Sequence, residues 1–240
     1  MKFTTILMDA DDTIFDFPKC EYFALKESIE DFDLNFSEEV YNCFSSINAA
    51  LWRKFEINKI TRSELKVQRF RELVRQCFAG FERSDQMAEK YVEALSGQAI
   101  LLDGAFEALE SLSESYAIYI ITNGLKPVQR GRFSRTDITK FIKKLYISDE
   151  IGTQKPNKAY FDYVLSDIPE KDLSKILVVG DSLTSDMQGG RNAGLTTCLF
   201  DPKNKIEMPN DLCDYKITSL MEIFDIDKDD KNEIYGFAGA

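Results

Sequence analysis

Polar and charged side chains stand at, or just beyond, the ends of several strand-like segments in this sequence. In chain order they are Asp9, Asp11 and Thr13, then Thr122, Asn123 and Gly124, then Lys155, and finally Asp181, Ser182 and Asp186. Each group alone is ordinary, because acidic pairs, Thr-Asn-Gly and Lys-Pro sequences are all common in turns. In a parallel α/β sheet, however, ligands bind beyond the carboxyl ends of the strands. Together, the groups predict one site at that edge.

Four aspartates of this set are expected to meet in one cleft: Asp9, Asp11, Asp181 and Asp186. Carboxylates that lie close together raise one another's pKa and destabilise the fold unless a cation compensates them. The chain offers no histidine ligand, so an oxygen-only site is implied, which suits Mg²⁺. Together with the Lys155 ammonium, Mg²⁺ would neutralise most of the carboxylate charge. A phosphate dianion could then bind in the same cleft.

The absence of histidine narrows the possible chemistry. It excludes Ser-His-Asp and Cys-His hydrolases, HExxH metalloproteases and histidine-based phosphatases. The five cysteines are odd in number and never spaced as CxxC, which argues against a disulfide framework and against a zinc site. A net charge of −11 argues against binding to nucleic-acid polymers or anionic membranes, although it is compatible with small anionic substrates.

Strand patterns alternate with helix patterns over most of the chain. The predicted strands cover residues 3–8, 117–121, 144–147, 176–179 and 196–200. The predicted helices between them cover residues 105–114, a segment after Gly124, residues 158–166 and residues 185–193. This alternation is typical of α/β proteins, and it predicts a Rossmann-like parallel sheet with helices on both faces.

A block of purely helical periodicity follows the first strand. Its predicted helices cover residues 19–31, 38–57, 62–79 and 84–96. Ser37 and Thr61 are the expected N-caps of the second and third helices, and Thr61 forms a capping-box pair with Glu64. We therefore expect residues 1–17 and 98–240 to form the catalytic core, with residues 18–97 as an all-helical insertion.

Other segments favour structural interpretations. The glycines of residues 189–194 lack the GxxxxGK[ST] order of a phosphate loop, so we expect close helix–sheet packing and a helix C-cap there. The acidic residues 225–230 lack the glycine and glutamate of an EF-hand loop, so we expect a solvated, frayed end. Neither a membrane span nor a secretory signal is expected, and we anticipate a cytoplasmic monomer or weak dimer.

The ordered motifs resemble those of the haloacid dehalogenase superfamily. The matching segments are Asp9-Ala10-Asp11-Asp12-Thr13, Ile121-Thr122-Asn123, Lys155-Pro156 and Gly180-Asp181-Ser182-Leu183-Thr184-Ser185-Asp186. The resemblance covers nearly the whole chain and places the helical insertion where this family carries its cap domain. Asp12 stands where a glycine is commoner, but several phosphatase branches also have Asp-Asp-Thr at this place.

This resemblance implies a Mg²⁺-dependent phosphomonoesterase that acts on small phosphate esters. Asp9 would attack phosphorus and form an aspartyl-phosphate, and Asp11 would serve as general acid and base. Lys155 would neutralise charge in the transition state. The implied phosphate-binding residues are Thr122, Asn123, Gly124 and Lys155. The implied metal ligands are the Asp9 carboxylate, the Asp11 carbonyl and Asp181, with Thr13, Ser182 and Asp186 in support.

Residues 51–56 and 60–65 of the insertion, with Arg69-Phe70, resemble the pyrimidine 5′-nucleotidase branch. That resemblance implies non-canonical pyrimidine nucleoside 5′-monophosphates as substrates. Trp52 and Phe55 could then stack on a base, although aromatic residues on an amphipathic helix are more often part of the core. A sugar-phosphate or phosphoglycolate phosphatase is an alternative with the same chemistry and a different cap pocket.

Proteins of other classes share parts of this pattern. A 2-haloacid dehalogenase needs neither magnesium nor a second acid, so Asp11 and Asp181 argue against it. A phosphoglucomutase is less favoured because the cap has no histidine to contribute. A phospho-aspartate signalling module also gathers acidic residues, Thr and Lys around Mg²⁺, but its acceptor follows a later strand and it lacks a large helical insertion. A non-catalytic interaction protein with this fold stays open, because motifs alone do not establish activity.

Overall fold

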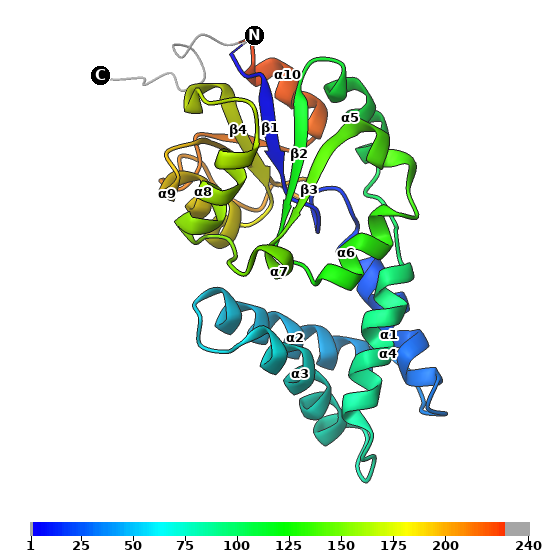
Figure 1. Ribbon diagram of the computed structural model, residues 1–240. Coiled ribbons are helices and arrows are strands. Elements are labelled where there is room, and N and C mark those ends of the chain that lie inside the picture. Colours follow the sequence, from blue (N-terminus) through cyan, green and yellow to red (C-terminus); the bar gives the residue numbers. More distant parts are fainter. Residues whose placement is uncertain (1, 229–240) are drawn as a thin grey trace, which may run out of the picture.

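A parallel sheet lies beside a separate layer of helices in the computed structural model, which describes residues 2–228 (Figure 1). The strand order is β3-β2-β1-β4-β5-β6, and every neighbouring pair is parallel. The strands are β1 (Thr5–Met8), β2 (Ala117–Thr122), β3 (Ile142–Ile147), β4 (Ile176–Gly180), β5 (Thr196–Phe200) and β6 (Tyr215–Ile217). The strand order reverses at β1, which pairs with both β2 and β4, and such a reversal is where ligands bind in open α/β sheets.

Both faces of the sheet are apolar and covered by helices. Along β1, Ile6 and Met8 belong to one core cluster, whereas Leu7 belongs to the cluster on the opposite face. The helices α5 (Ala105–Ser113) and α10 (Ile223–Ile226) contribute to the first cluster. On the second face lie α8 (Lys158–Asp167) and α9 (Gln188–Asn192). The predicted Rossmann-like fold with helices on both faces is confirmed.

The glycines around α9 allow it to approach its neighbours closely, as expected. A Cβ atom at Gly189 would lie 2.4 Å from the ring of Phe161, and one at Gly190 would lie 2.6 Å from the Thr197 methyl group. Gly194 has a φ of +75° just after the helix ends, in the left-handed conformation that glycine commonly adopts at a helix C-terminus. This segment therefore packs a helix against the sheet.

The all-helical insertion after the first strand is also confirmed. Its helices are α1 (Phe17–Glu30), α2 (Glu38–Glu56), α3 (Arg62–Cys77) and α4 (Ser84–Gly97). They share an apolar cluster of their own, in which the rings of Phe44, Phe70 and Tyr91 pack together. Figure 1 shows α2 and α3 below the carboxyl ends of the central strands, with α1 and α4 to one side.

Two adjacent segments connect the insertion with the sheet. The Asp16 amide donates to the Ile100 carbonyl at 2.9 Å, and the Leu102 amide donates to the Ile14 carbonyl at 2.8 Å. The outgoing and returning chains are therefore hydrogen-bonded to each other. Beside them, α6 (Lys126–Phe133), which follows β2, packs against α4.

The predicted caps of α2 and α3 are present. The Ser37 hydroxyl accepts a hydrogen bond from the Val40 amide at 3.4 Å. The Thr61 amide donates to the Glu64 carboxylate at 2.7 Å, while the Thr61 hydroxyl accepts from the Glu64 amide at 3.2 Å. The bonds between Thr61 and Glu64 fix the turn between α2 and α3, which is the end of the insertion that faces the sheet edge.

The C-terminal part of the structure differs from the prediction. The short strand β6 was not predicted, because three residues are too few to show a clear alternation. The expected frayed end is wrong for Ile226, which is buried, and for Asp227, whose carboxylate accepts the Phe3 amide at 2.8 Å. This carboxylate satisfies an amide that precedes β1. Residues 229 and 230 of the acidic stretch lie outside the described residues.

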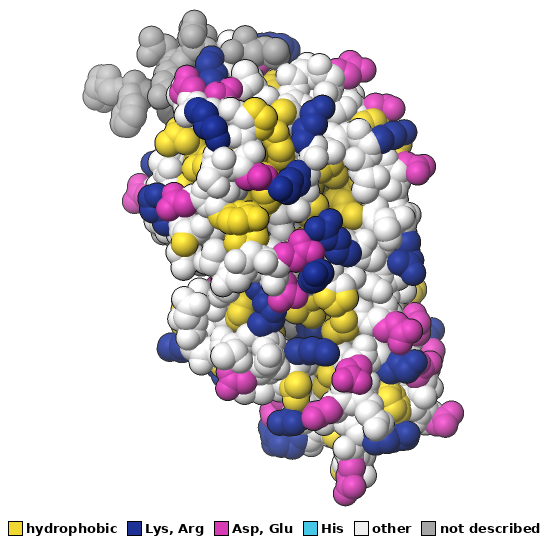
Figure 2. Space-filling view, in the orientation of Figure 1, with side chains coloured by type: hydrophobic (Ala, Val, Ile, Leu, Met, Phe, Trp, Pro, Cys, Tyr) yellow, Lys and Arg dark blue, Asp and Glu magenta, His cyan; other side chains and the backbone are white. Residues whose placement is uncertain are grey.

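Charged side chains of both signs are interspersed on the face shown in Figure 2. Ion pairs occur among the described residues, for example between Arg130 and Glu150 at 2.7 Å and between Lys144 and Asp167 at 2.6 Å. Within residues 2–228, no helix combines the length and the apolar character needed to cross a lipid bilayer.

Candidate active site

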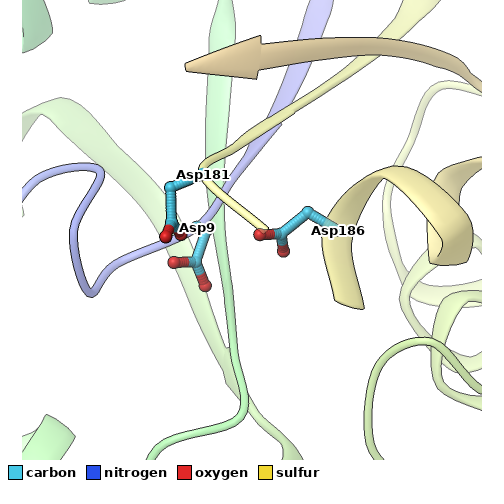
Figure 3. A group of neighbouring side chains, drawn as sticks. All are labelled: Asp9, Asp181 and Asp186. Carbon is cyan, nitrogen blue, oxygen red and sulfur yellow. The ribbon is translucent and has the colours of Figure 1, made fainter. Parts of the chain in front are cut away.

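Three carboxylates converge where β1 and β4 end. Asp9 follows β1, Asp181 follows β4, and Asp186 lies in the helical turn Leu183–Met187 after it. Figure 3 shows Asp9 and Asp181 side by side, with Asp186 directed toward them. One carboxylate oxygen of each residue lies within 4.8 Å of the other two. Because β1 and β4 are neighbours in the sheet, the topology itself produces this convergence.

The ammonium group of Lys155 joins two of these carboxylates. Its Nζ lies 2.5 Å from Asp9 Oδ1 and 2.6 Å from Asp186 Oδ1, and it donates to the Ile121 carbonyl at 2.9 Å. Burial alone would lower the pKa of this ammonium, but the charges of Asp186 and Asp9 outweigh that effect and raise the pKa above its ordinary value. Lys155 is therefore a permanent positive charge inside the site.

The carboxylate cluster nevertheless carries excess negative charge. Burial raises the pKa of Asp9 to about 8, despite the opposing effect of Lys155. Asp181 opens into the pocket, but the protein atoms around it and the charges of Asp9 and Asp186 raise its pKa well above the ordinary value. A cation among these groups would relieve the cost of ionising them. All the available donors are oxygen atoms, so a hard divalent cation such as Mg²⁺ fits the site.

The segment Thr122–Gly124 begins with the last residue of β2 and lies at the same edge of the sheet. The Thr122 hydroxyl accepts the Gly124 amide at 3.0 Å. The Asn123 side chain donates to the Lys155 carbonyl at 2.9 Å and accepts from the Lys155 amide at 3.0 Å. Asn123 thus fixes the backbone that carries Lys155, which is a structural contribution beyond its expected contact with phosphate.

A pocket of about 230 Å³ opens over these groups. Most of its walls belong to the sheet edge, including Asp9, Thr122 and Asp181. Trp52 and Glu56 reach it from α2 of the insertion. The pocket is therefore shared by the sheet and the helical insertion, so that both determine which molecule fits.

Asp11 points away from the carboxylate cluster, toward α6. Its Oδ1 accepts a hydrogen bond from Arg132 Nη1, and its Oδ2 accepts one from Gln129 Nε2 at 2.7 Å. Both donors are completely buried. All four aspartates line the same pocket, as expected. Among them, only Asp9, Asp181 and Asp186 have carboxylate oxygens within 4.8 Å of one another, because Asp11 pairs with the buried Arg132.

Other predicted residues shape the backbone of the site. Asp12 has a φ of +60°, a left-handed conformation that glycine adopts most easily and that aspartate tolerates. Thr13 is fully buried, and its hydroxyl has no hydrogen-bond partner among residues 2–228. The Ser182 hydroxyl caps the following turn by accepting the Ser185 amide at 3.2 Å, and the Ser182 amide donates to Asp186 Oδ2 at 3.2 Å.

The two aromatic residues considered for base stacking have different surroundings. Trp52 is half-buried and lines the pocket. Phe55 is buried, packs edge-to-face on Trp52 with ring centroids 5.6 Å apart, and is covered by the Arg62 guanidinium 4.9 Å from its centroid. Trp52 is accessible to a substrate, whereas Phe55 belongs to a buried cluster, in agreement with the core interpretation of aromatic residues on this helix.

Arg62 makes a connection that sequence reasoning missed. From the start of α3, it donates to the Asn123 carbonyl at 3.0 Å and to the Ser148 hydroxyl at 2.8 Å, and its Nε lies 3.4 Å from Asp149. Ser148 and Asp149 begin α7 (Ser148–Ile151), which follows β3. A cation is unfavourable at a helix N-terminus, so an arginine at this position indicates a partner elsewhere in the protein.

Gln129 and Arg132 were missed as well. Their spacing of three residues places them on one face of α6, beside the buried Val128 and Phe133. Two long polar side chains on the apolar face of a helix require polar partners inside the protein. That pattern, on a helix directly after Thr122–Gly124, could have indicated a link to the site.

Comparisons with known proteins agree with this geometry. The sequence profile of the haloacid dehalogenase-like hydrolases matches residues 6–200. The HAD-hydrolase YfnB of Bacillus subtilis is 37% identical over 226 residues, which are 94% of this chain and 95% of that protein. Pyrimidine 5′-nucleotidase YjjG of Escherichia coli is 32% identical over 93% of this chain and 97% of that protein. Pyrimidine 5′-nucleotidase PynA of Streptococcus pneumoniae is 30% identical over 94% and 95%, respectively.

Solved structures show the same architecture. The crystal structure of magnesium-bound YfnB, which is described as revealing an interdomain movement, has a TM-score of 0.89 and 35% identity. The match covers 95% of this chain and 100% of that one. A 2-haloacid dehalogenase from Pseudomonas syringae has a TM-score of 0.65 at 22% identity, over 93% of this chain and 97% of that one. At an identity of 22%, the match to the dehalogenase indicates a common fold alone.

Proposed function

This chain belongs to the haloacid dehalogenase-like hydrolases, and we propose that it is a magnesium-dependent phosphomonoesterase with Asp9 as its nucleophile. The contact between Lys155 Nζ and Asp9 Oδ1, at 2.5 Å inside the carboxylate cluster, is the observation that carries this proposal. A carboxylate that attacks a phosphate ester must approach other negative charges. A buried ammonium beside it lowers that repulsion and stabilises the charge that develops in the transition state.

The proposed reaction has two steps. Asp9 attacks phosphorus and forms an aspartyl-phosphate while the bond to the leaving alcohol breaks. Asp11 enters this step in its protonated form and gives that proton to the leaving oxygen. In the second step, Asp11 takes a proton from a water molecule, whose oxygen attacks phosphorus, so that inorganic phosphate leaves and Asp9 is restored.

The sheet edge supplies the groups that hold the phosphate and the metal. The Thr122 hydroxyl and the amides of Asn123 and Gly124 bind phosphoryl oxygens in this proposal. The Asp9 and Asp181 carboxylates and the Asp11 carbonyl would hold Mg²⁺, and Asp186 orients Lys155 through their contact at 2.6 Å. When bound, Mg²⁺ neutralises the carboxylates and polarises a phosphoryl oxygen. YfnB was solved bound to magnesium, which supports magnesium as the metal.

We further propose that residues 18–97 act as a cap domain over a core formed by residues 1–17 and 98–240. Trp52 and Glu56 of α2 line the pocket, so the insertion can enclose a substrate and exclude water from the reaction. The interdomain movement of YfnB supports a cap that opens and closes.

Among small phosphate esters, pyrimidine nucleoside 5′-monophosphates are the substrates we favour. Trp52 offers an aromatic surface for a base in the pocket that holds Asp9. YjjG and PynA, which align over most of this chain, are named as pyrimidine 5′-nucleotidases. A sugar phosphate is the second candidate, because a ribulose-1,5-bisphosphate 5-phosphatase from Halopiger xanaduensis is 24% identical over 93% of this chain.

A panel of nucleoside monophosphates and sugar phosphates, assayed with and without Mg²⁺, tests this proposal. We expect sustained turnover that requires Mg²⁺, with the highest kcat/KM for a pyrimidine nucleotide. Asp9→Asn should abolish turnover without unfolding the protein, and near-normal turnover by that variant would refute the assigned nucleophile. Single labelling by acetyl phosphate without turnover would instead indicate a signalling module.

A further inference from the structure

We propose that Arg132 and Gln129 position the Asp11 carboxylate and couple its orientation to the two segments that join the helical insertion to the sheet. This inference rests on the proposed role of Asp11 as acid and base. Each oxygen of Asp11 accepts a hydrogen bond from a different residue of α6. Two donors on two oxygens fix the plane of a carboxylate as well as its position.

Arg132 contacts both segments that lead into and out of the insertion. Its Nε donates to the Gln98 carbonyl at 3.0 Å, just after α4 ends. Its Nη2 lies 3.5 Å from the sulfur of Cys20 in α1. The guanidinium also lies 4.0 Å from the centroid of the Phe15 ring. One completely buried group therefore contacts the outgoing chain, the returning chain and Asp11.

The planar fork of arginine is required for this arrangement. Its nitrogens donate in different directions at fixed angles, whereas a lysine ammonium would act as a point charge with one flexible position. A lysine at residue 132 could pair with Asp11, but it could not hold the Gln98 carbonyl with the same geometry. The contacts thus assign Arg132 a role that goes beyond neutralising Asp11.

Gln129 reaches Asp11 only because residue 124 is glycine. A Cβ atom at Gly124 would lie 2.1 Å from Gln129 Nε2, which is an impossible contact. The other end of the amide, Oε1, is buried and has no hydrogen-bond partner in the described part of the chain. A buried acceptor without a partner costs free energy. The Gln129 side chain therefore keeps its hydrogen bond to Asp11 at the cost of leaving its Oε1 without a partner.

A mechanical consequence follows from these contacts. Cys20 lies in the first turn of α1 and Gln98 directly follows α4, so a movement of the insertion relative to the sheet would displace one or both of them. Such a movement would change the contacts of Arg132 and thereby the orientation of Asp11. Arg132 and Gln129 are positioning residues, since they act on the reaction through Asp11 and not by touching the substrate.

Two esters with different leaving groups distinguish positioning from a merely structural role. A nitrophenolate leaves without assistance, whereas the alkoxide of a nucleoside 5′-monophosphate needs a proton from a general acid. The parameter kcat/KM reports the steps up to formation of the aspartyl-phosphate. A misplaced acid therefore lowers kcat/KM for the nucleotide more than for p-nitrophenyl phosphate, while loss of folded protein lowers both equally.

The test compares Gln129→Leu and Arg132→Lys with the wild-type protein in the presence of Mg²⁺. Asp11→Asn serves as the reference, because it removes the acid itself. We expect each variant to lose about 10- to 100-fold in kcat/KM for the nucleotide and only a few-fold for p-nitrophenyl phosphate. Arg130→Gln is the matched control on the same helix, because Arg130 is exposed and bonds to Glu150; it should change neither value.

Equal losses for both esters in folded Gln129→Leu and Arg132→Lys would overturn the inference while leaving the proposed function intact, provided that Asp11→Asn discriminates between them. If Arg132→Lys does not fold, Gln129→Leu decides, because it preserves every charge. Absence of turnover by the wild-type protein on both esters would overturn the proposed function and this inference with it.

Discussion

The helical insertion meets the sheet at two junctions of opposite chemistry. At the hinge junction, α4 lies against α6, and Val128 of α6 joins the apolar cluster of the insertion. At the tip junction, the α2–α3 turn and its flanks touch the sheet edge through hydrogen bonds. Arg62 donates to the Asn123 carbonyl there, and Gln154 Nε2 donates to the Phe55 carbonyl at 3.2 Å.

This difference indicates which junction can open. Separating apolar surfaces costs about 25 cal/mol per Å² of newly exposed area, whereas a hydrogen bond that is exchanged for water costs only about 1 kcal/mol. A cavity of about 440 Å³ also remains at the tip junction, lined on one side by Lys59 and on the other by Gly152. We therefore expect the insertion to rotate about the hinge junction and to separate from the sheet at the tip junction.

The largest expected effect is on stability in the apolar cluster that Val128 of α6 shares with the insertion. Leu25 of α1 is fully buried in the apolar cluster, so Leu25→Ala should lower the free energy of unfolding by about 2–5 kcal/mol. Ile57, in the α2–α3 turn, is 60% exposed, and Ile57→Ala should change the free energy of unfolding by less than about 0.5 kcal/mol. Urea unfolding of both variants measures these two changes in the free energy of unfolding. Similar losses in Leu25→Ala and Ile57→Ala would contradict the expected difference.

A pH-dependent effect is expected inside the insertion. Burial raises the pKa of Glu21 to about 7, against the opposing effects of Asn48 and Arg69. Its ordinary value is 4.5, so the folded protein binds this proton more tightly than the unfolded chain does. Folding stability therefore decreases as pH rises through this range, and Glu21→Gln should remove a loss of about 3 kcal/mol.

Urea unfolding at several pH values between 4.5 and 8 measures this effect, with the wild-type protein and the Glu21→Gln variant in parallel. The difference in unfolding free energy between them should change in favour of the variant as pH rises. If the difference in unfolding free energy stays constant with pH, water reaches the Glu21 carboxyl in the folded protein. The insertion would then be less different from the hydrogen-bonded tip junction than we expect.

A smaller effect is expected at the tip junction, on substrate binding. Arg62→Gln removes charged hydrogen bonds that hold the insertion against the sheet, so the closed state becomes less populated and KM should rise about tenfold. The free energy of unfolding should change little. Arg71→Gln is the control, because Arg71 lies on the same helix and bonds to Asp85 at the surface. A large loss of stability in Arg62→Gln would mean that the tip junction is structural.

The smallest expected effect concerns Gln154. Its amide donates to the Phe55 carbonyl at 3.2 Å and to the Asn58 side chain at 3.4 Å, and both bonds are neutral. Gln154→Ala should raise KM about two- to fivefold, in line with the modest net free energy of such bonds. Steady-state kinetics measure this value, and an effect greater than that of Arg62→Gln would reverse the order proposed for the tip contacts.

Sequence patterns predicted the site residues whose positions are set by the ends of the strands. Asp9 and Asp181 directly follow β1 and β4, and Thr122 is the last residue of β2. Parallel strands bring their carboxyl ends to one edge. Once the strands are identified, these side chains must be neighbours. The same reasoning placed the helical insertion and the caps of its helices, since both depend on residues close together in the chain.

The orientation of Asp11 could not be predicted in this way. It depends on Arg132, which is 121 residues away in sequence, and periodicity carries no information about such a pair. The contacts of Arg62 with Asn123 and Ser148 depend likewise on how the insertion is placed over the sheet. Asp227 was misjudged for a related reason, because an acidic residue near a chain end is usually solvated and only the tertiary structure brings it to the Phe3 amide.

The hydrogen bonds between residues 14–16 and 100–102 bring the two ends of the insertion together. A segment that departs and returns at one point can be exchanged for another, or shortened to a loop, with little displacement of the strands beside it. Selection for a new substrate could thus act on one exchangeable stretch of the gene, while Asp9 and Lys155 keep the spacing that bond cleavage requires. Recognition and reactivity would then evolve at separate rates within a single polypeptide.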